Sequence, residues 1–218
     1  MVVVLGADGC RGGGWIVARF DGALRWDWAD DTAALLVLAG DAVLAMDVPI
    51  GLPSPGSLRQ CDVQARLRLG PRRSSVFAAP PRSVLGCATY AEARPLAPSL
   101  SAQAFGLVPR IREVDEALRS RGPRVHDRVI ECHPELAFAT MGELPLATKK
   151  SAAGALQRIA LLESVWGRLP ADVPVGAALD DALDAAACAW VARRWATGAA
   201  ESLGDETDEL GLPMRIVV

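Results

Sequence analysis

A wholly apolar run, Val2–Ala7, restricts the possible folds of this chain more than any other segment, and it ends in Asp8-Gly9. A continuous apolar run of this length is typical of a strand buried on both faces of a sheet. A second such run, Ala42–Val48, carries Asp47 near its end and stops at Pro49. Because functional groups in open α/β sheets collect at the carboxyl ends of the strands, both aspartates are candidates for a site.

The residues between these two runs predict a hairpin followed by a helix. Trp15–Phe20 and Leu24–Trp28 flank an Asp-Gly pair, which is a strong hairpin signal. Asp30-Asp31-Thr32 supplies candidate N-caps for a helix over Ala33–Ala39, which Gly40 ends. The predicted order is therefore strand, hairpin, helix, strand.

After Pro49 the pattern becomes less regular, and we expect an insertion over about residues 50–124. It holds a helix over Leu58–Leu69, a proline-rich irregular stretch at Ala78–Pro98, and a helix in which Ile111, Val114 and Leu118 keep helical spacing. Beyond the insertion the sequence predicts a strand, two helices and a short edge strand: Arg128–Cys132, Ala152–Trp166, Ala177–Ala196 and Arg215–Val218. At 218 residues the chain suits one domain, 1–218, that includes the insertion.

The last predicted helix carries three acidic residues near its start, Asp180, Asp181 and Asp184. Asp181 and Asp184 are three positions apart and share a helix face, which continues as an apolar stripe. Charge at the positive end of the helix explains one acid, but an unpaired carboxylate on the core side is costly unless a cation neutralises it. Considered alone, Asp8 has the simpler interpretation of a turn residue, and Asp47 that of a residue that starts a loop.

Together, carboxylates on two adjacent strands and a facing helix predict a site for Mg²⁺ or Mn²⁺. The expected metal ligands are Asp8, Asp47 and Asp184, and the expected catalytic set adds Asp181 and Glu131. Two such ions activate water and stabilise the leaving oxygen in phosphodiester hydrolysis. His133, beside Glu131, is either a general base or a loop histidine, and we favour the loop.

Two short basic segments are candidate substrate-binding residues. Arg72-Arg73-Ser74 combines guanidinium groups with a hydroxyl, which suits phosphate oxygens. Lys149-Lys150 contains the only two lysines in the sequence. Either segment can equally be an ordinary solvated surface.

Charge and composition exclude several classes of protein. The net charge of −3, from 23 basic and 26 acidic residues, excludes a general nucleic-acid coat, so any contact with DNA or RNA is local. The five scattered cysteines form no C-x-x-C pair, which argues against structural zinc and favours reduced thiols in the cytoplasm. No dinucleotide fingerprint or Walker A sequence occurs, and no apolar run matches a signal peptide or a membrane span.

Taken in order, several segments resemble the domain of unknown function 429 family, whose members are described as predicted RNase H-like nucleases. The matching stretches are GADGCRGGGWIVA, MDVPIGLP, CDVQARLRLG-PRRSSVF, Gln103 to Asp115, IECHPELAF, the Thr148-Lys149-Lys150 region and DDALDAAACAW. The helix that carries Asp181 and Asp184 also resembles the D-x-x-D-A helix of RuvC-type Holliday-junction resolvases.

This resemblance implies an α/β, RNase H-like fold with a mixed five-stranded sheet flanked by helices and a helical or irregular insertion after the fourth strand. The hairpin strands would lie antiparallel on one side of the Asp8 strand, and the Asp47 and Glu131 strands on its other side. It implies a metal-dependent phosphodiesterase or nuclease of the two-metal type. A non-catalytic RNase H-like binding module and, less favoured, an ATP-dependent phosphotransferase of the actin and sugar-kinase type are alternatives. DNA, RNA, a junction and a small nucleotide are all open as substrates, and the sequence indicates no oligomeric state.

Overall fold

The computed structural model describes residues 2–142 and 146–218, which form two compact units. The first, here called the sheet unit, contains the described residues up to Asp47, together with Arg128–Glu201 and Val217–Val218. The second, the insertion unit, contains Val48–Asp127 and Ser202–Ile216. The insertion expected over about residues 50–124 falls inside this second unit, which also takes in a segment from near the C-terminus.

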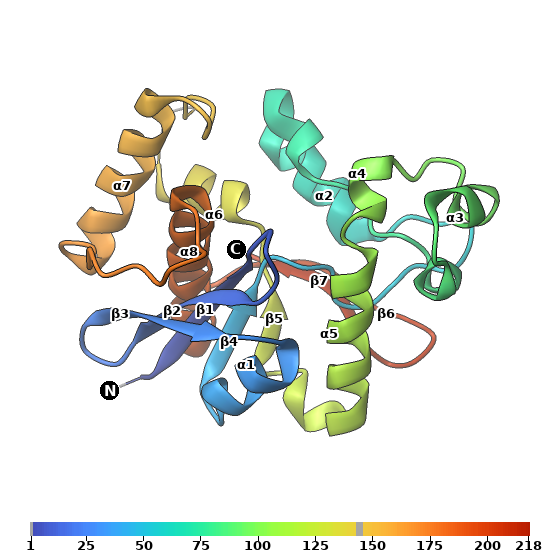
Figure 1. Ribbon diagram of the computed structural model, residues 1–218, viewed down its shortest axis with the longest axis horizontal. Helices are drawn as coiled ribbons and strands as arrows, with labels where there is room; N and C mark the ends of the chain where they lie inside the picture. Colours follow the sequence, from blue (N-terminus) through green and yellow to red (C-terminus); the bar gives the residue numbers. More distant parts are fainter. Residues whose placement is uncertain (1, 143–145) are drawn as a thin grey trace. The chain divides into compact units, whose positions relative to one another are not determined.

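The sheet unit is built on a mixed five-stranded sheet in the order β3-β2-β1-β4-β5. Its strands are β1 (Val4–Gly9), β2 (Trp15–Phe20), β3 (Leu24–Ala29), β4 (Val43–Met46) and β5 (Val129–Glu131). β1 runs antiparallel to β2 and parallel to β4, and β4 runs parallel to β5 (Figure 1). This arrangement is consistent with an RNase H-like topology and confirms the α/β fold class expected from the sequence.

Among the described residues, the helices of the sheet unit are α1 (Thr32–Ala39), α6 (Pro134–Met141), α7 (Ala152–Trp166) and α8 (Leu179–Ala196). α1 begins where expected, because the Asp31 carboxylate accepts a hydrogen bond of 2.7 Å from the Ala34 backbone N–H. α8 has 18 residues and packs against β1, β2 and β4 (Figure 1). In the part of the chain that the structure describes, no helix is long and apolar enough to cross a membrane.

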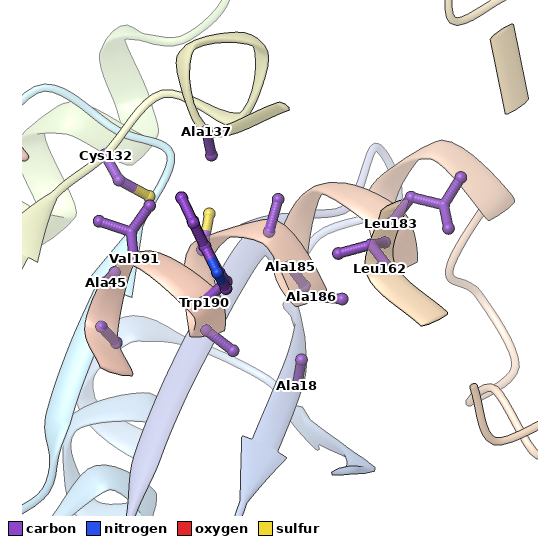
Figure 2. Packing of buried hydrophobic residues seen from close by; sticks show 14 of the residues in the cluster. Ala18, Ala45, Cys132, Ala137, Leu162, Leu183, Ala185, Ala186, Trp190 and Val191 are labelled. Carbon is purple, nitrogen blue, oxygen red and sulfur yellow. The ribbon is translucent and has the colours of Figure 1, made fainter. Parts of the chain in front are cut away.

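The core of the sheet unit is organised around α8, which is buried at every position from Ala182 to Ala192. A helix that is buried all round is a central element rather than a surface one. Figure 2 shows its side chains between Ala18 and Ala45 of the sheet and Ala137 of α6. α7 packs along it as well. The helix is therefore held by neighbours on several sides.

α8 approaches β1 closely because Gly6 has no side chain. A Cβ atom at Gly6 would lie 1.9 Å from the Ala189 nitrogen and 2.2 Å from the Ala185 oxygen, both backbone atoms of α8. A glycine within a strand commonly marks such an approach of another backbone. Alternate residues of a strand face the same side, so Asp8 lies on the same face as Gly6 and is directed toward α8. The contact that docks the helix thus also sets its distance from Asp8.

The insertion unit is mainly helical. Its described elements are α2 (Gln60–Leu69), η1 (Gly70–Ser75), η2 (Arg82–Gly86), α3 (Tyr90–Leu96), α4 (Ala102–Phe105), α5 (Val108–Arg121), η3 (Pro123–Val125), β6 (Ser202–Thr207) and all but the last residue of β7 (Pro213–Val217). α2 and α5 correspond to the two predicted helices. The stretch expected to be irregular contains α3 instead, which begins with Thr89 as an N-cap and tolerates Pro95 near its end. β7 corresponds to the predicted edge strand, and it pairs with β6 in a two-stranded sheet.

Candidate functional site

Asp8 and Asp47 lie side by side at the carboxyl edge of the sheet. The parallel register of β1 and β4 ends with Ala7 opposite Met46, so the next residue on each strand is an aspartate. The Asp47 backbone N–H donates a hydrogen bond of 3.3 Å to the Ala7 carbonyl oxygen, which continues the pairing by one step. Because Asp47 is two residues beyond Ala45, it faces α8 as Asp8 does.

α8 presents two further acids to the same region, Asp181 and Asp184. Asp184 is 3% exposed and precedes Cys188, whose backbone lies against Gly6, by about one helical turn. Asp181 is half-buried, and its carboxylate accepts a hydrogen bond of 3.2 Å from the Ala178 backbone N–H. Asp181 is therefore the acid that the positive end of the helix accounts for. The helix terminus does not explain the burial of Asp184, so its charge needs a separate positive partner.

The charges of these aspartates act on one another. Burial raises the pKa of Asp8 well above its ordinary value, and the negative charges of Asp47, Asp184 and Asp181 raise it further. Burial also raises the pKa of Asp47 to about 7, although the charge of Lys149 opposes this shift. Asp184 has its pKa raised by burial to about 6, against the same opposing lysine. The structure thus brings together the three aspartates predicted as metal ligands, with Asp181 beside them.

Lys149 provides the positive charge that is nearest to this cluster. Its ammonium nitrogen lies 2.7 Å from Asp184 Oδ2, and its side chain is 39% exposed whereas that of Asp184 is 4% exposed. Burial acts to lower the pKa of Lys149, but the charge and hydrogen bond of Asp184 outweigh it, so the pKa is raised overall. The sequence analysis names Lys149 as a candidate phosphate-binding residue, which stays a prediction, and the structure shows it as the partner of a buried carboxylate.

Glu135 also belongs to the cluster, although the sequence analysis did not include it among the candidate site residues. It lies in the first turn of α6, where Pro134 occupies the first helical position. Its carboxylate bonds Arg158 at 2.6 Å, and its charge contributes to the raised pKa of Asp47 and of Asp184. The signal was present in the sequence, because a proline followed by an acid directly after a strand is typical of a helix start.

Glu131 points away from the aspartates. It is the register partner of Met46 across the parallel pair β4–β5, so both side chains lie on the face of the sheet opposite to Ala45 and Asp47. It is buried there, at 5% exposure. His133 lies at the N-cap position of α6, which is consistent with the favoured interpretation of this residue as a loop histidine. Glu131 is thus the one member of the predicted catalytic set that the structure places apart from the others.

The two predicted basic segments fall in different units. Arg72, Arg73 and Ser74 lie on η1 of the insertion unit, where no side chain is buried. Lys149 and Lys150 lie in the sheet unit, in the wall of a cavity of about 340 Å³. The other residues that line this cavity are Arg11, Ala155, Arg158, Leu179, Asp180, Leu183 and Asp184. Only the lysine pair is therefore shown beside the acids.

The cluster has the chemistry of a site for a hard divalent cation, since its donors are all carboxylate oxygens and their charges repel one another. Within residues 2–142 and 146–218, however, no three Asp, Glu, His or Cys side chains stand together as a complete ligand set. Binding a cation would require aspartate side chains to rotate toward each other and Asp184 to exchange its bond with Lys149. The residues therefore fit such an ion by type, but not in the arrangement that the structure shows.

Comparison with known proteins gives one match. The profile of the family described as "Protein of unknown function (DUF429)" matches residues 6–209, which include all four aspartates of the cluster, Lys149 and Glu135. No curated protein and no solved structure matches the chain. Since the match covers most of the sequence, the chain belongs to the DUF429 family.

Proposed function

We propose that this protein is a phosphodiesterase that depends on Mg²⁺ or Mn²⁺ and acts on nucleic acid. Asp8, Asp47 and Asp184 would bind the metal, and Asp181 would support them. The observation that carries the proposal is the convergence of carboxylates from β1, β4 and α8 on one edge of the sheet, where burial and the neighbouring charges raise the pKa of Asp8. Repulsion between carboxylates lowers the stability of the folded protein. Groups whose pKa is strongly shifted are concentrated at functional sites.

The roles of the residues follow from their positions. A bound divalent cation supplies water activation and Lewis-acid stabilisation of a phosphodiester. Asp8 and Asp47 offer oxygens from two rigid, adjacent strands, and Asp184 offers one from the buried helix. Lys149 would bind a phosphate oxygen after its ammonium group leaves Asp184, which is supported by the partial exposure of its side chain. Glu135 holds Arg158 and so keeps the guanidinium beside the site.

The test is hydrolysis by the purified full chain with Mg²⁺, Mn²⁺ or EDTA, on single-stranded and double-stranded DNA, RNA and a junction. Asp184→Asn and Asp47→Asn should each lower the metal-dependent rate by about a hundredfold or more, because each removes a charged ligand. Asp27→Asn is the matched control, since Asp27 lies on β3 opposite Val17, a residue of the other sheet face. Equal rates in all three variants, or activity that survives EDTA, would refute the proposal.

A second candidate function is a non-catalytic binding module that retains the fold. The specific observation in its favour is the Lys149–Asp184 pair, because a lysine can neutralise a buried carboxylate in place of a metal. Thermal unfolding separates the two candidates. A cation bound only by the folded state stabilises it by about 2.7 kcal/mol at a hundredfold excess over Kd, and Asp184→Asn should abolish that shift. An unchanged melting curve in millimolar Mn²⁺ would favour the binding module.

A further inference from the structure

The cavity beside Lys149 and Asp184 is not explained by metal binding. Its walls come from the turn after β1, the segment before α7, α7 itself and the first turns of α8. All of these segments belong to the sheet unit. At about 340 Å³ it lies at the small end of the ~300–1,000 Å³ typical of ligand pockets. It therefore suits a ligand with the dimensions of a single nucleotide rather than a duplex.

The cavity gathers positive charge in a chain whose net charge is −3. Four of its lining residues are basic and two are acidic: Arg11, Lys149, Lys150 and Arg158 against Asp180 and Asp184. Arg11 and Lys150 are exposed, and neither forms an ion pair within the part of the chain described. These two cations contribute little to the fold and are available to a ligand.

Arg11 is held near the cavity by a tight turn. The Cys10 N–H donates to the Gly14 carbonyl oxygen and the Gly13 N–H donates to the Cys10 carbonyl oxygen, both at 3.2 Å. Gly13 and Gly14 have φ of 94° and 70°, a backbone region that other residues rarely adopt. A guanidinium on a short, constrained turn loses less freedom when it binds an anion than one on a long loop.

Arg158 gives the cavity a fixed cationic wall. Its side chain is 1% exposed and donates hydrogen bonds to Glu135, to the Ala147 carbonyl oxygen and to the Gly154 carbonyl oxygen. Its Nε has no hydrogen-bond partner among the described residues. Because Glu135 and the two carbonyl oxygens hold the guanidinium in place, Arg158 is a fixed part of the cavity wall, unlike the exposed Arg11 and Lys150.

We propose that the cavity binds the phosphate of a nucleotide-sized phosphoester, with Arg11 and Lys150 contacting the phosphate oxygens and Lys149 linking that phosphate to Asp184. The inference rests on the proposed function, because it assigns the substrate class of the same site. A strand end held here has its terminal phosphate beside Asp184 and presents the next ester to the aspartates, whereas a small phosphodiester presents its own ester. The source of this group is either a small phosphodiester or the phosphorylated end of a strand.

Binding is tested in EDTA, so that it does not depend on metal. The probes are inorganic phosphate, thymidine 5′-monophosphate and thymidine, measured by equilibrium dialysis. Wild-type protein should bind the two phosphates and not thymidine. Arg11→Ala with Lys150→Ala should weaken phosphate binding about tenfold or more, because each removes a charged hydrogen bond. Arg25→Ala with Arg128→Ala removes the same charge from the amino end of the sheet and should have little effect. Equal affinities in the two double variants would overturn the inference.

Hydrolysis in Mn²⁺ separates the two sources of substrate. Linear oligonucleotides with a terminal phosphate, the same oligonucleotides without it, circular single strands and bis(p-nitrophenyl) phosphate are compared. Preference for phosphorylated ends supports a strand end, preference for the small diester supports a small molecule, and faster cleavage of circles overturns the inference. If the Arg11/Lys150 variant cleaves normally, the cavity assignment fails and the proposed function stands. If nothing is cleaved although phosphate binding depends on Arg11 and Lys150, the proposed function fails and the cavity stands.

Discussion

Buried aspartates occur in both units, and the two units neutralise them differently. In the insertion unit, Asp62 receives two hydrogen bonds from Arg59, at 2.5 and 3.1 Å, and a third from the Ala79 backbone. Arg82 bonds Asp115 at 2.7 Å and Asp208 at 2.5 Å, and backbone N–H groups also donate to Asp208. These three buried acids are therefore each paired with a guanidinium, and Asp115 and Asp208 share that of Arg82.

In the sheet unit, four aspartates and Glu135 converge around a single lysine and the paired Arg158, and the pKa of Asp8, Asp47 and Asp184 rises. Burial alone therefore does not mark a functional acid. A carboxylate that is buried with a bidentate arginine serves the fold, whereas one buried among other carboxylates has a raised pKa and is a candidate for ligand binding. The balance of charge around a buried carboxylate therefore distinguishes a structural acid from a candidate functional one.

The largest effect that this comparison predicts is in the insertion unit. Arg59→Met should lower the free energy of unfolding by about 3–5 kcal/mol, because it leaves Asp62 buried without its cation. Circular dichroism in urea measures this loss. Tryptophan fluorescence, which reports on the sheet unit because all six tryptophans lie there, should change less.

Two variants complete that experiment. Arg25→Met breaks the exposed pair with Asp21 and should cost at most about 1 kcal/mol. Arg59→Met combined with Asp62→Leu should recover much of the loss, since a buried ion pair can be replaced by apolar side chains. A double variant as unstable as the single one would show that the pair does more than neutralise charge.

Removing an acid from the sheet unit should increase stability, whereas removing Arg59 from the insertion unit decreases it. Asp47→Asn, measured in EDTA at pH 7, should raise the free energy of unfolding by about 0.5–2 kcal/mol, because it relieves repulsion and desolvation that the metal-free protein bears. Tryptophan fluorescence during urea unfolding follows this unit. Asp27→Asn should leave stability nearly unchanged. A destabilised Asp47→Asn protein would mean that Lys149 already balances the cluster.

The pH dependence of the unfolding free energy, measured without metal, tests the same difference between the two units. The folded-state pKa is about 7 for Asp47 and about 6 for Asp184, both above the ordinary value of 3.8, so the folded protein holds protons more tightly than the unfolded chain. Their contribution to stability is complete below about pH 4 and is lost as the pH rises toward 7. The unfolding free energy in EDTA should fall across this range, and the fall should be smaller in Asp47→Asn. Parallel curves for the two proteins would contradict this assignment.

The smallest effect concerns Lys149. Lys149→Met should lower the metal-free unfolding free energy by about 1 kcal/mol or less, because this ion pair is only partly buried. The same change should tighten Mn²⁺ binding severalfold, since the ammonium no longer competes for Asp184. Lys150→Met, one residue along and exposed, is the control for both measurements. Weaker Mn²⁺ binding in Lys149→Met would show that the lysine assists the metal.

Local sequence signals predicted the sheet well, because its elements have strong patterns of their own. The Asp-Gly hairpin, the Asp31 cap and the two apolar runs correspond to β2, β3, α1, β1 and β4. β6 was missed because Ser202–Thr207 is polar and mostly exposed, and its strand conformation comes from pairing with β7. α3 was missed because Pro95 reads as a helix breaker, although only the last turn has to accommodate it.

The site could be predicted only as far as its residues sit on regular elements. Asp8, Asp47 and Asp184 were recognised because strand ends and helix faces are readable in a sequence. Glu131 was expected to join them, but a shift of one residue along a strand reverses the face, and β5 is too short for its pattern to show which face applies. The bond between Lys149 and Asp184 depends on the path of an irregular segment, which no periodicity describes.

The close contact between Gly6 and α8 also ties the site to the course of folding. The strand and the helix that it joins are far apart in the sequence, so bringing them together closes a very long loop. Such contacts form slowly, and the acids of α8 meet those of β1 and β4 only when this loop is closed. The cluster of aspartates is therefore complete only in a chain whose α8 has been synthesised and docked.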